Sequence, residues 1–202
     1  IPVQIVVGDM HGLNTLEHQP AKVAAMEANW ETQANVPLVW FAIPDETTRE
    51  NKFEISIPNG ASLILKHSVD GVIPGLNDFV TDDGEVLHPP VAPVFYAFRV
   101  MVGMGMLMLL VSFKVAYTLY RQGEPKRWEA RVLVGMTFSG WVATLAGWYV
   151  TEIGRQPWIV TGVLDTGSAA AIHPVPILGL SLATYLIVYI GLLSAYIATL
   201  WH

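Results

Sequence analysis

Three long apolar runs in the second half of the chain are the feature that most constrains its fold. Residues 175–201 contain no charged side chain in 27 positions, and residues 132–152 carry their only charge at the last position. Residues 94–120 contain only Arg99 near the start and Lys114 near the end. About 20 apolar residues let a helix cross a bilayer, and in lipid only helices and closed barrels satisfy the backbone. We therefore predict three transmembrane helices.

Charge divides the chain into two parts. Residues 1–93 hold thirteen acidic side chains against four Lys or Arg, whereas residues 94–202 hold four acidic and seven basic ones. Three transmembrane helices alone are too few to bury many polar groups. We therefore predict an all-α integral membrane fold in which residues 94–202 belong to a larger helical bundle and residues 1–93 precede it outside the lipid. The start at Ile1, without an initiator Met, is interpreted as a fragment that lacks its beginning.

The basic residues predict the orientation of the three helices. The connection over residues 121–131 holds four Lys or Arg, and the connection over residues 153–174 holds Arg155 alone. By the positive-inside rule, the first connection is cytoplasmic and the second lies outside. Residues 1–93 are then also outside, on the periplasmic face in a Gram-negative bacterium. The chain has no cysteine, which excludes disulfides and thiolate metal sites.

The outer segment combines several short elements. Residues 20–33 begin with a proline and have apolar side chains at helical spacing, which predicts a helix. Residues 36–44 are apolar but contain two prolines, and we expect an apolar loop there that either covers a lipophilic ligand or anchors at the interface. Residues 53–58 alternate as a short strand does. Residues 69–93, rich in Asp, Gly and Pro, predict a loop.

Two candidate sites lie in the apolar half, and each has a simpler structural explanation. Glu152 and Arg155 are three residues apart at a helix end, so they share one helical face. Ionisable groups at that depth are functional candidates, although an interfacial ion pair that ends the helix explains them equally well. Met101, Met104 and Met108 are a candidate source of soft ligands, although methionines at helical spacing are more often core filler.

Four motifs, in this order and spacing, resemble subunit I of the cytochrome bd-type quinol oxidases. They are Gly8-Asp9 with the run Lys22 to Thr32; Ile43-Pro44-Asp45 followed by Asn51-Lys52-Phe53; Val91 to Val102; and Gly154-Arg155-Gln156-Pro157-Trp158 with its upstream Gly147-Trp148 and Glu152. The resemblance covers nearly the whole chain. It implies the C-terminal part of that subunit, in its short-loop branch. Residues 1–93 would be the end of a membrane helix plus the quinol-binding loop, and the spans 94–120, 132–152 and 175–201 would be the last three helices.

The resemblance also implies functional roles. Lys22 and Glu27 match loop positions associated with quinol oxidation. They are about 140° apart around a helix, so they would line one pocket only if the helix lies at its edge. Asp45 and Glu50 are weaker candidates for the same site. A carboxylate within hydrogen-bond reach of quinol can accept its proton.

Haem ligation is implied for the membrane helices. Met101 would be an axial ligand of the low-spin haem b, with Arg99 near that haem. Glu152 would be an axial ligand of the high-spin haem b, with Trp148 beside the haem pair and Arg155 near the haem carboxylates. The oxygen site would hold haem d, or a b-type haem in its place. The implied activity is quinol oxidation coupled to the reduction of oxygen to water.

The implied partners are the N-terminal part of the same subunit, a second oxidase subunit, a small accessory subunit as a further candidate, membrane lipid and quinol. We expect a bacterial cytoplasmic membrane location and no nucleic-acid partner. Two alternatives stay open: a haem- or quinone-binding anchor without oxygen chemistry, and a non-catalytic membrane scaffold or transporter segment. No histidine lies inside a predicted span, and we interpret all six as solvated loop or terminal residues: His11, His18, His67, His88, His173 and His202.

Overall fold

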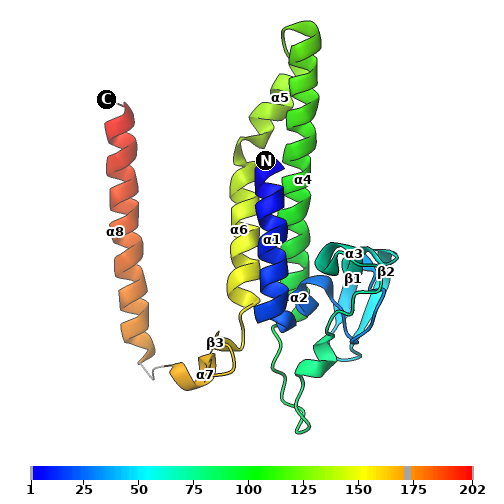
Figure 1. Ribbon diagram of the computed structural model, residues 1–202. Coiled ribbons are helices and arrows are strands. Elements are labelled where there is room, and N and C mark those ends of the chain that lie inside the picture. The colour runs from blue at the N-terminus through cyan, green and yellow to red at the C-terminus, as the bar shows by residue number, and fades with distance from the viewer. Residues whose placement is uncertain (1, 171–173, 202) are drawn as a thin grey trace. The chain divides into compact units, whose positions relative to one another are not determined.

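The computed structural model describes residues 2–170 and 174–201, which form two compact units, Ile1–Thr166 and Gly167–His202 (Figure 1). The second unit contains the helix α8 (Val175–Trp201), which has the predicted bounds of the third span. The short helix α7 (Thr166–Ala169) begins at the junction of the units. His173 and His202 lie outside the described residues.

The first unit contains the other two long apolar helices. Helix α4 (Val91–Gln122) is the longest helix of the unit, and the chain returns beside it through α5 (Arg127–Gly135) and α6 (Ser139–Ile153) (Figure 1). Together with α8, these make three helices in the described residues that are long and apolar enough to cross a membrane. The prediction of three membrane-spanning helices is thus confirmed by their length and composition.

The second span differs from the single helix predicted over residues 132–152. It begins at Arg127 and tightens into a 3₁₀ turn, η2 (Met136–Phe138), before α6. Hydroxyl groups that bond to nearby carbonyls compete with the regular helical ladder. Here the Thr137 hydroxyl donates to the Val134 carbonyl at 2.7 Å, and the Ser139 hydroxyl donates to the Met136 carbonyl at 2.7 Å.

The outer segment is built on helices and one small sheet. It comprises α1 (Pro2–His18), α2 (Pro20–Glu27), β1 (Leu38–Asp45), β2 (Glu50–Ile57), α3 (Gly60–Lys66) and the 3₁₀ turn η1 (Leu76–Phe79). Strands β1 and β2 pair antiparallel, with Leu38 opposite Ile57 and Asp45 opposite Glu50. After α6, β3 (Trp158–Val160) and β4 (Leu164–Asp165) form a second two-stranded sheet. The all-α prediction therefore holds for the membrane spans, but these two small sheets depart from it.

Two predictions in the outer segment were wrong. The helix predicted over residues 20–33 ends at Glu27, because Ala28 takes a left-handed conformation and the Asn29 side chain bonds the Pro74 carbonyl at 3.1 Å. The apolar loop expected over residues 36–44 is largely the strand β1: Pro37 precedes the strand, and Pro44 lies opposite Asn51 near the end of the strand.

The core of the first unit joins the outer segment to α4. Small side chains on α2 let it approach α4 closely, and the β1 residues Val39 and Ala42 pack beside them. The main buried cluster consists of Ala24, Ala25, Ala28, Trp30, Val39, Ala42, Leu76, Val91, Val94 and Phe95. A second cluster joins α1, α2 and α3 through Leu16, Val23, Val36, Ala61 and Ile73. The outer segment is thus fixed on the first turns of a membrane helix.

The far end of α4 is joined to α5 by a buried carboxylate. Glu129 is 1% exposed and accepts hydrogen bonds from the Lys114 ammonium at 3.0 Å, the Thr118 hydroxyl at 2.8 Å and the Lys126 backbone N–H at 3.0 Å. A buried carboxylate is tolerated when such partners satisfy it. This network, which we call the α4–α5 latch, fixes the corner between the first two spans.

We predict that Thr118→Val weakens the latch without changing side-chain volume. Loss of one interhelical hydrogen bond in a membrane protein costs about 1 kcal/mol, which unfolding of the full complex in detergent would measure. Thr184→Val is the matched control, because that hydroxyl bonds the Leu180 carbonyl of its own helix. Equal stability of the two variants would contradict the latch.

Candidate functional site

Glu27 is a buried carboxylate at the end of α2. Its residue is 4% exposed, and its Oε2 lies 3.0 Å from Nη2 of Arg99 on α4, 72 positions later in the chain. Burial raises the pKa of the Glu27 carboxyl above its ordinary value, and the Arg99 charge and hydrogen bond oppose that rise. The carboxylate therefore combines a partner that orients it with surroundings that favour the uptake of a proton.

Arg99 ties three elements together through the fork of its guanidinium. Besides Glu27, it donates from Nε to the Val39 carbonyl of β1 at 3.1 Å and from Nη1 to the Met26 carbonyl of α2. Its guanidinium also lies 3.7 Å from the centre of the Phe95 ring, a cation–π geometry. The sequence interpretation placed Arg99 near a haem and Glu27 at the quinol loop, and the structure joins the two residues directly.

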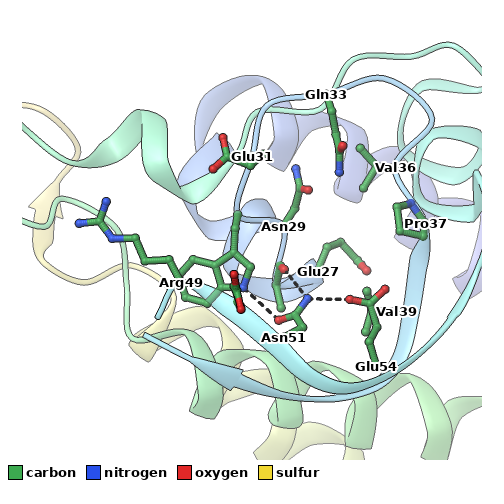
Figure 2. Close-up of a pocket in the computed structure, with 13 residues that line it drawn as sticks. Glu27, Asn29, Glu31, Gln33, Val36, Pro37, Val39, Arg49, Asn51 and Glu54 are labelled. Atoms are coloured by element: carbon green, nitrogen blue, oxygen red, sulfur yellow. Dashed lines mark hydrogen bonds between the residues drawn. The ribbon is translucent and has the colours of Figure 1, made fainter. Parts of the chain in front are cut away.

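A polar cavity of about 350 Å³ opens on the Glu27 side of this pair (Figure 2). Asn51 of β2 organises its wall: the Trp30 indole donates to its Oδ1 at 3.0 Å, and its Nδ2 donates to the Ala28 carbonyl at 3.0 Å and to Glu54 at 3.1 Å. Charged side chains also line it, namely Glu27, Glu31, Arg49, Glu50 and Glu54. The cavity therefore offers acidic groups between the buried carboxylate and the outside.

An apolar groove of about 500 Å³ lies on the Arg99 side of the pair, between β1 and α4. Val39 borders both the groove and the polar cavity. The other residues that line the groove are Leu38, Trp40, Phe98, Arg99, Val102, Gly103, Met106 and Leu110. The Glu27–Arg99 pair thus stands between a polar space and an apolar one.

Lys22 lies in a different cavity from Glu27. This cavity, of about 210 Å³, is also lined by Gly154, Gln156 and Trp158. A β-carbon added to Gly154 would lie 3.0 Å from Cγ of Lys22, so the Lys22 stem packs on the end of α6. The pKa of Lys22 is lowered, chiefly by burial and then by the Arg155 charge, whereas the Glu152 carboxylate opposes this shift. The two predicted quinol-loop residues therefore face separate spaces.

The residues assigned to haem lie along α4 and α6. A β-carbon on Gly147 would lie 3.0 Å from Sδ of Met101, which places the thioether against α6. Trp148 is 58% exposed, and one turn later the half-exposed Glu152 pairs with Arg155 at 2.5 Å. In residues 2–170 and 174–201, no three His, Cys, Asp or Glu side chains converge on a metal position.

These residues fit haem groups better than a bare metal ion. A lone thioether or carboxylate holds iron when a porphyrin supplies the equatorial ligands. Trp148 leaves an apolar surface open on α6, and the half-exposed Glu152–Arg155 pair places a carboxylate and a cation one turn later. The donor set is therefore compatible with the ligand roles that the resemblance implies for Met101 and Glu152.

Asp45 and Glu50, the weaker candidates for the quinol site, lie in different surroundings in the structure. Asp45 accepts hydrogen bonds from the Thr47 N–H at 2.9 Å and from Lys52 at 2.5 Å, and these bonds lower its pKa to about 2. Asp45 therefore shapes the β1–β2 turn, whereas Glu50 lines the polar cavity.

The histidines in the described residues are not all solvated. His88 is 8% exposed, and its Nδ1 lies 2.9 Å from the Pro89 carbonyl. The prediction that His88 is a solvated loop residue was therefore wrong, because the chain packs around it just before α4.

Sequence reasoning missed Asn51 as the centre of the cavity wall. It also missed that Glu27 and Arg99 form a pair. The sequence carries no local signal for either arrangement, because each depends on contacts between distant segments.

Comparisons with known proteins agree on one family. A family model for cytochrome bd terminal oxidase subunit I matches residues 1–202. The chain is 31% identical over 172 residues to cytochrome bd ubiquinol oxidase subunit 1 of Bacillus subtilis, covering 81% of this chain and 36% of that protein. It is 28% identical over 254 residues to cytochrome bd-II ubiquinol oxidase subunit 1 of Escherichia coli, covering 95% and 49%.

A solved structure of bd oxidase from Geobacillus thermodenitrificans is also similar. It superposes with a TM-score of 0.76 and 32% identity, covering 95% of this chain and 43% of that chain. The chain therefore spans less than half the length of each of these three relatives.

We predict that Arg99→Lys loosens the outer segment although the charge is kept. Lysine cannot reproduce the planar fork that holds Glu27, Val39 and Met26 together. Limited proteolysis of the full complex should cut within residues 38–57 about tenfold faster, because hydrogen bonds to charged groups contribute roughly 1.5–3 kcal/mol. Arg49→Lys is the control, since Arg49 is exposed and makes a 3.4 Å bond to Asn77. Equal cutting of both variants would contradict the role assigned to Arg99.

Proposed function

The chain belongs to the cytochrome bd terminal oxidase subunit I family, and from that premise we propose that it supplies a quinol-oxidising site and haem-binding residues to a terminal oxidase. The enzyme would oxidise membrane quinol and reduce oxygen to water. The observation that carries the proposal is the buried Glu27–Arg99 pair between a polar cavity and an apolar groove. The family match favours this function over the anchor and scaffold alternatives.

Glu27 is the proposed proton acceptor. Quinol oxidation releases protons as well as electrons, and a carboxylate of raised pKa is a suitable general base. Arg99 keeps the carboxylate oriented toward the site. Protons would leave Glu27 through the polar cavity, whose lining includes the carboxylates of Glu31, Glu50 and Glu54. The groove on the Arg99 side of the pair is lined mainly by apolar residues.

Lys22 is proposed as a second contributor to quinol oxidation. It lines another cavity than Glu27, and its cation is close enough to Glu152 and Arg155 for their charges to act on its pKa. Lys22 would therefore act electrostatically, through its charge beside the end of α6. It would not transfer the proton that Glu27 accepts.

Five residues of the spans and their ends would hold and surround the haems. Met101 offers its thioether to the low-spin haem b, and Glu152 offers its carboxylate to the high-spin haem b. Trp148 lies one turn before Glu152, and Arg155 is available for the haem carboxylates. Arg99, two residues before Met101, places a positive charge close to the low-spin group. When bound, the haems accept the electrons and carry the oxygen chemistry.

The proposed setting is a complex in the bacterial cytoplasmic membrane. The rest of the subunit would supply the remaining haem ligands, and a second oxidase subunit and a small accessory subunit would complete the assembly. Residues 1–93 would lie at the outer face, where the polar cavity meets the aqueous phase. Haem d, or a b-type haem in its place, would occupy the oxygen site.

We predict that Glu27→Gln in the full complex lowers kcat for quinol oxidation about 100-fold, because general-base catalysis typically contributes 10²–10⁴-fold. The amide keeps the shape of the side chain but cannot accept the proton. Haem absorption should stay unchanged. In the wild type, the rate should rise with pH through the raised pKa of Glu27, since only the ionised form accepts a proton, and this rise should be lost in the variant.

Glu85→Gln is the matched control for that experiment. Glu85 is exposed and lies outside the residues that line the polar cavity, so quinol kinetics should stay at the wild-type level. Wild-type quinol kinetics in Glu27→Gln would overturn the assignment of Glu27. Loss of haem in that variant would show that the carboxylate is structural.

We predict that Met101→Leu and Glu152→Gln change different haem signals. A Met-to-Leu swap of similar volume usually costs less than about 1.5 kcal/mol, so a packing role predicts a normal spectrum. Ligation predicts loss or a spin-state change of the low-spin haem b signal in Met101→Leu, and of the high-spin signal in Glu152→Gln. Met104→Leu on the same helix should leave both signals intact. Unchanged signals in either site variant would reject that residue as a ligand.

A further inference from the structure

The amide of Asn51 has a fixed orientation in the wall of the polar cavity that also contains Glu27 (Figure 2). Asn51 is half-buried on β2. The Trp30 indole N–H can only donate a hydrogen bond, so Oδ1 of Asn51 faces it, at 3.0 Å. The NH₂ group of the amide then faces the Ala28 carbonyl at 3.0 Å and the Glu54 carboxylate at 3.1 Å. The proposed function assigns no role to this side chain.

The backbone turn that follows Glu27 depends on the bond from Asn51. Helix α2 ends at Glu27, and Ala28 takes a left-handed conformation with φ of 51°. Glycine is the usual residue at such a helix end, because a β-carbon makes this conformation unfavourable. Ala28 is 1% exposed, so its carbonyl needs a partner within the protein. Asn51 provides that partner, which an ionised aspartate could not, because it has no donor.

Two side chains from different elements hold the backbone on either side of Glu27. Arg99 of α4 donates to the carbonyl of Met26, the residue before Glu27, and to the Glu27 carboxylate. Asn51 of β2 donates to the carbonyl of Ala28, the residue after it. The carboxylate is therefore fixed both at its head and through its backbone. Such preorganisation matters for a group that must lie within hydrogen-bond reach of a reacting proton.

We propose that Asn51 is a positioning residue for Glu27 in quinol oxidation. The inference rests on the proposed role of Glu27 as proton acceptor and deepens it. Asn51 does not take up the proton itself, because its amide stays neutral. It fixes the turn after Glu27, so that the carboxylate keeps the geometry in which it accepts a proton. Its second bond, to Glu54, holds another carboxylate of the cavity beside the same amide.

The test is a double-mutant cycle in the full oxidase complex with a single quinol. Asn51→Leu keeps the branched shape of the side chain but removes its hydrogen bonds. We expect kcat to fall about tenfold, since a misplaced catalytic group can cost up to about 100-fold, while KM and haem absorption stay unchanged. In the Glu27→Gln background, Asn51→Leu should lower kcat less than about twofold, because the group that it positions no longer accepts a proton.

Asn77→Leu is the matched control for the cycle. Asn77 also donates to a carboxylate, that of Glu31 at 2.6 Å, but it does not line the polar cavity. Its replacement should leave kcat unchanged in both backgrounds. A fall of kcat as large as that in Asn51→Leu would show a general loosening of the outer segment and would overturn the inference.

The cycle also separates a positioning role from a structural one. A fall of equal size for Asn51→Leu in both backgrounds, or no fall in the otherwise unchanged complex, would overturn the role of Asn51. Asn51→Ala is a second variant, for the case that Asn51→Leu does not assemble. Loss of haem absorption in both variants would assign Asn51 to folding alone and equally overturn it. Wild-type kinetics in Glu27→Gln would instead reject the proton acceptor, and with it the residue that positions it.

Discussion

The Glu27–Arg99 ion pair is the contact on which the outer half of the molecule depends. A buried charge that loses its partner is strongly destabilising, so neither residue can be satisfied unless α2 lies against α4. The carbonyls of Val39 and Met26 complete the guanidinium fork and draw β1 into the same arrangement. The polar cavity and the apolar groove exist because β1 is held at this position beside the helix. One interaction therefore defines both the docking of the segment and the boundary between its two cavities.

The membrane part of the fold could be predicted from the sequence because it follows from composition. An uncharged run of about 20 residues has few stable alternatives in lipid, and the predicted limits of residues 175–201 agree with α8. Details that depend on local hydrogen bonding could not be predicted in the same way. The 3₁₀ turn at Met136–Phe138 and the end of α2 at Glu27 are decided by hydroxyl and amide groups whose partners periodicity does not reveal.

The candidate site was predictable as a set of residues but not as a geometry. The resemblance to the quinol oxidases pointed to Lys22, Glu27 and Arg99, yet it placed the first two together and the third with a haem. In the structure Glu27 joins Arg99, and Lys22 turns toward the end of α6. The reason is the helical angle of about 140° between positions 22 and 27. Because α2 packs between α4 and the end of α6, Glu27 contacts Arg99 of α4, whereas Lys22 packs on the end of α6.

The position of Arg99 links the proton chemistry of the proposed site to its electron chemistry. Its guanidinium touches Glu27, and its backbone is two residues from Met101 on one rigid helix. Charges a few ångströms apart interact by several kcal/mol at the effective dielectric near a protein surface. Protonation of Glu27 leaves the Arg99 charge uncompensated, and an uncompensated positive charge favours an added electron nearby. By linkage, an electron held near Met101 stabilises the ionised guanidinium and favours the protonated carboxyl. In the proposed site, proton uptake at the Glu27 carboxylate and electron arrival at a haem held by Met101 would therefore support each other through the Arg99 side chain.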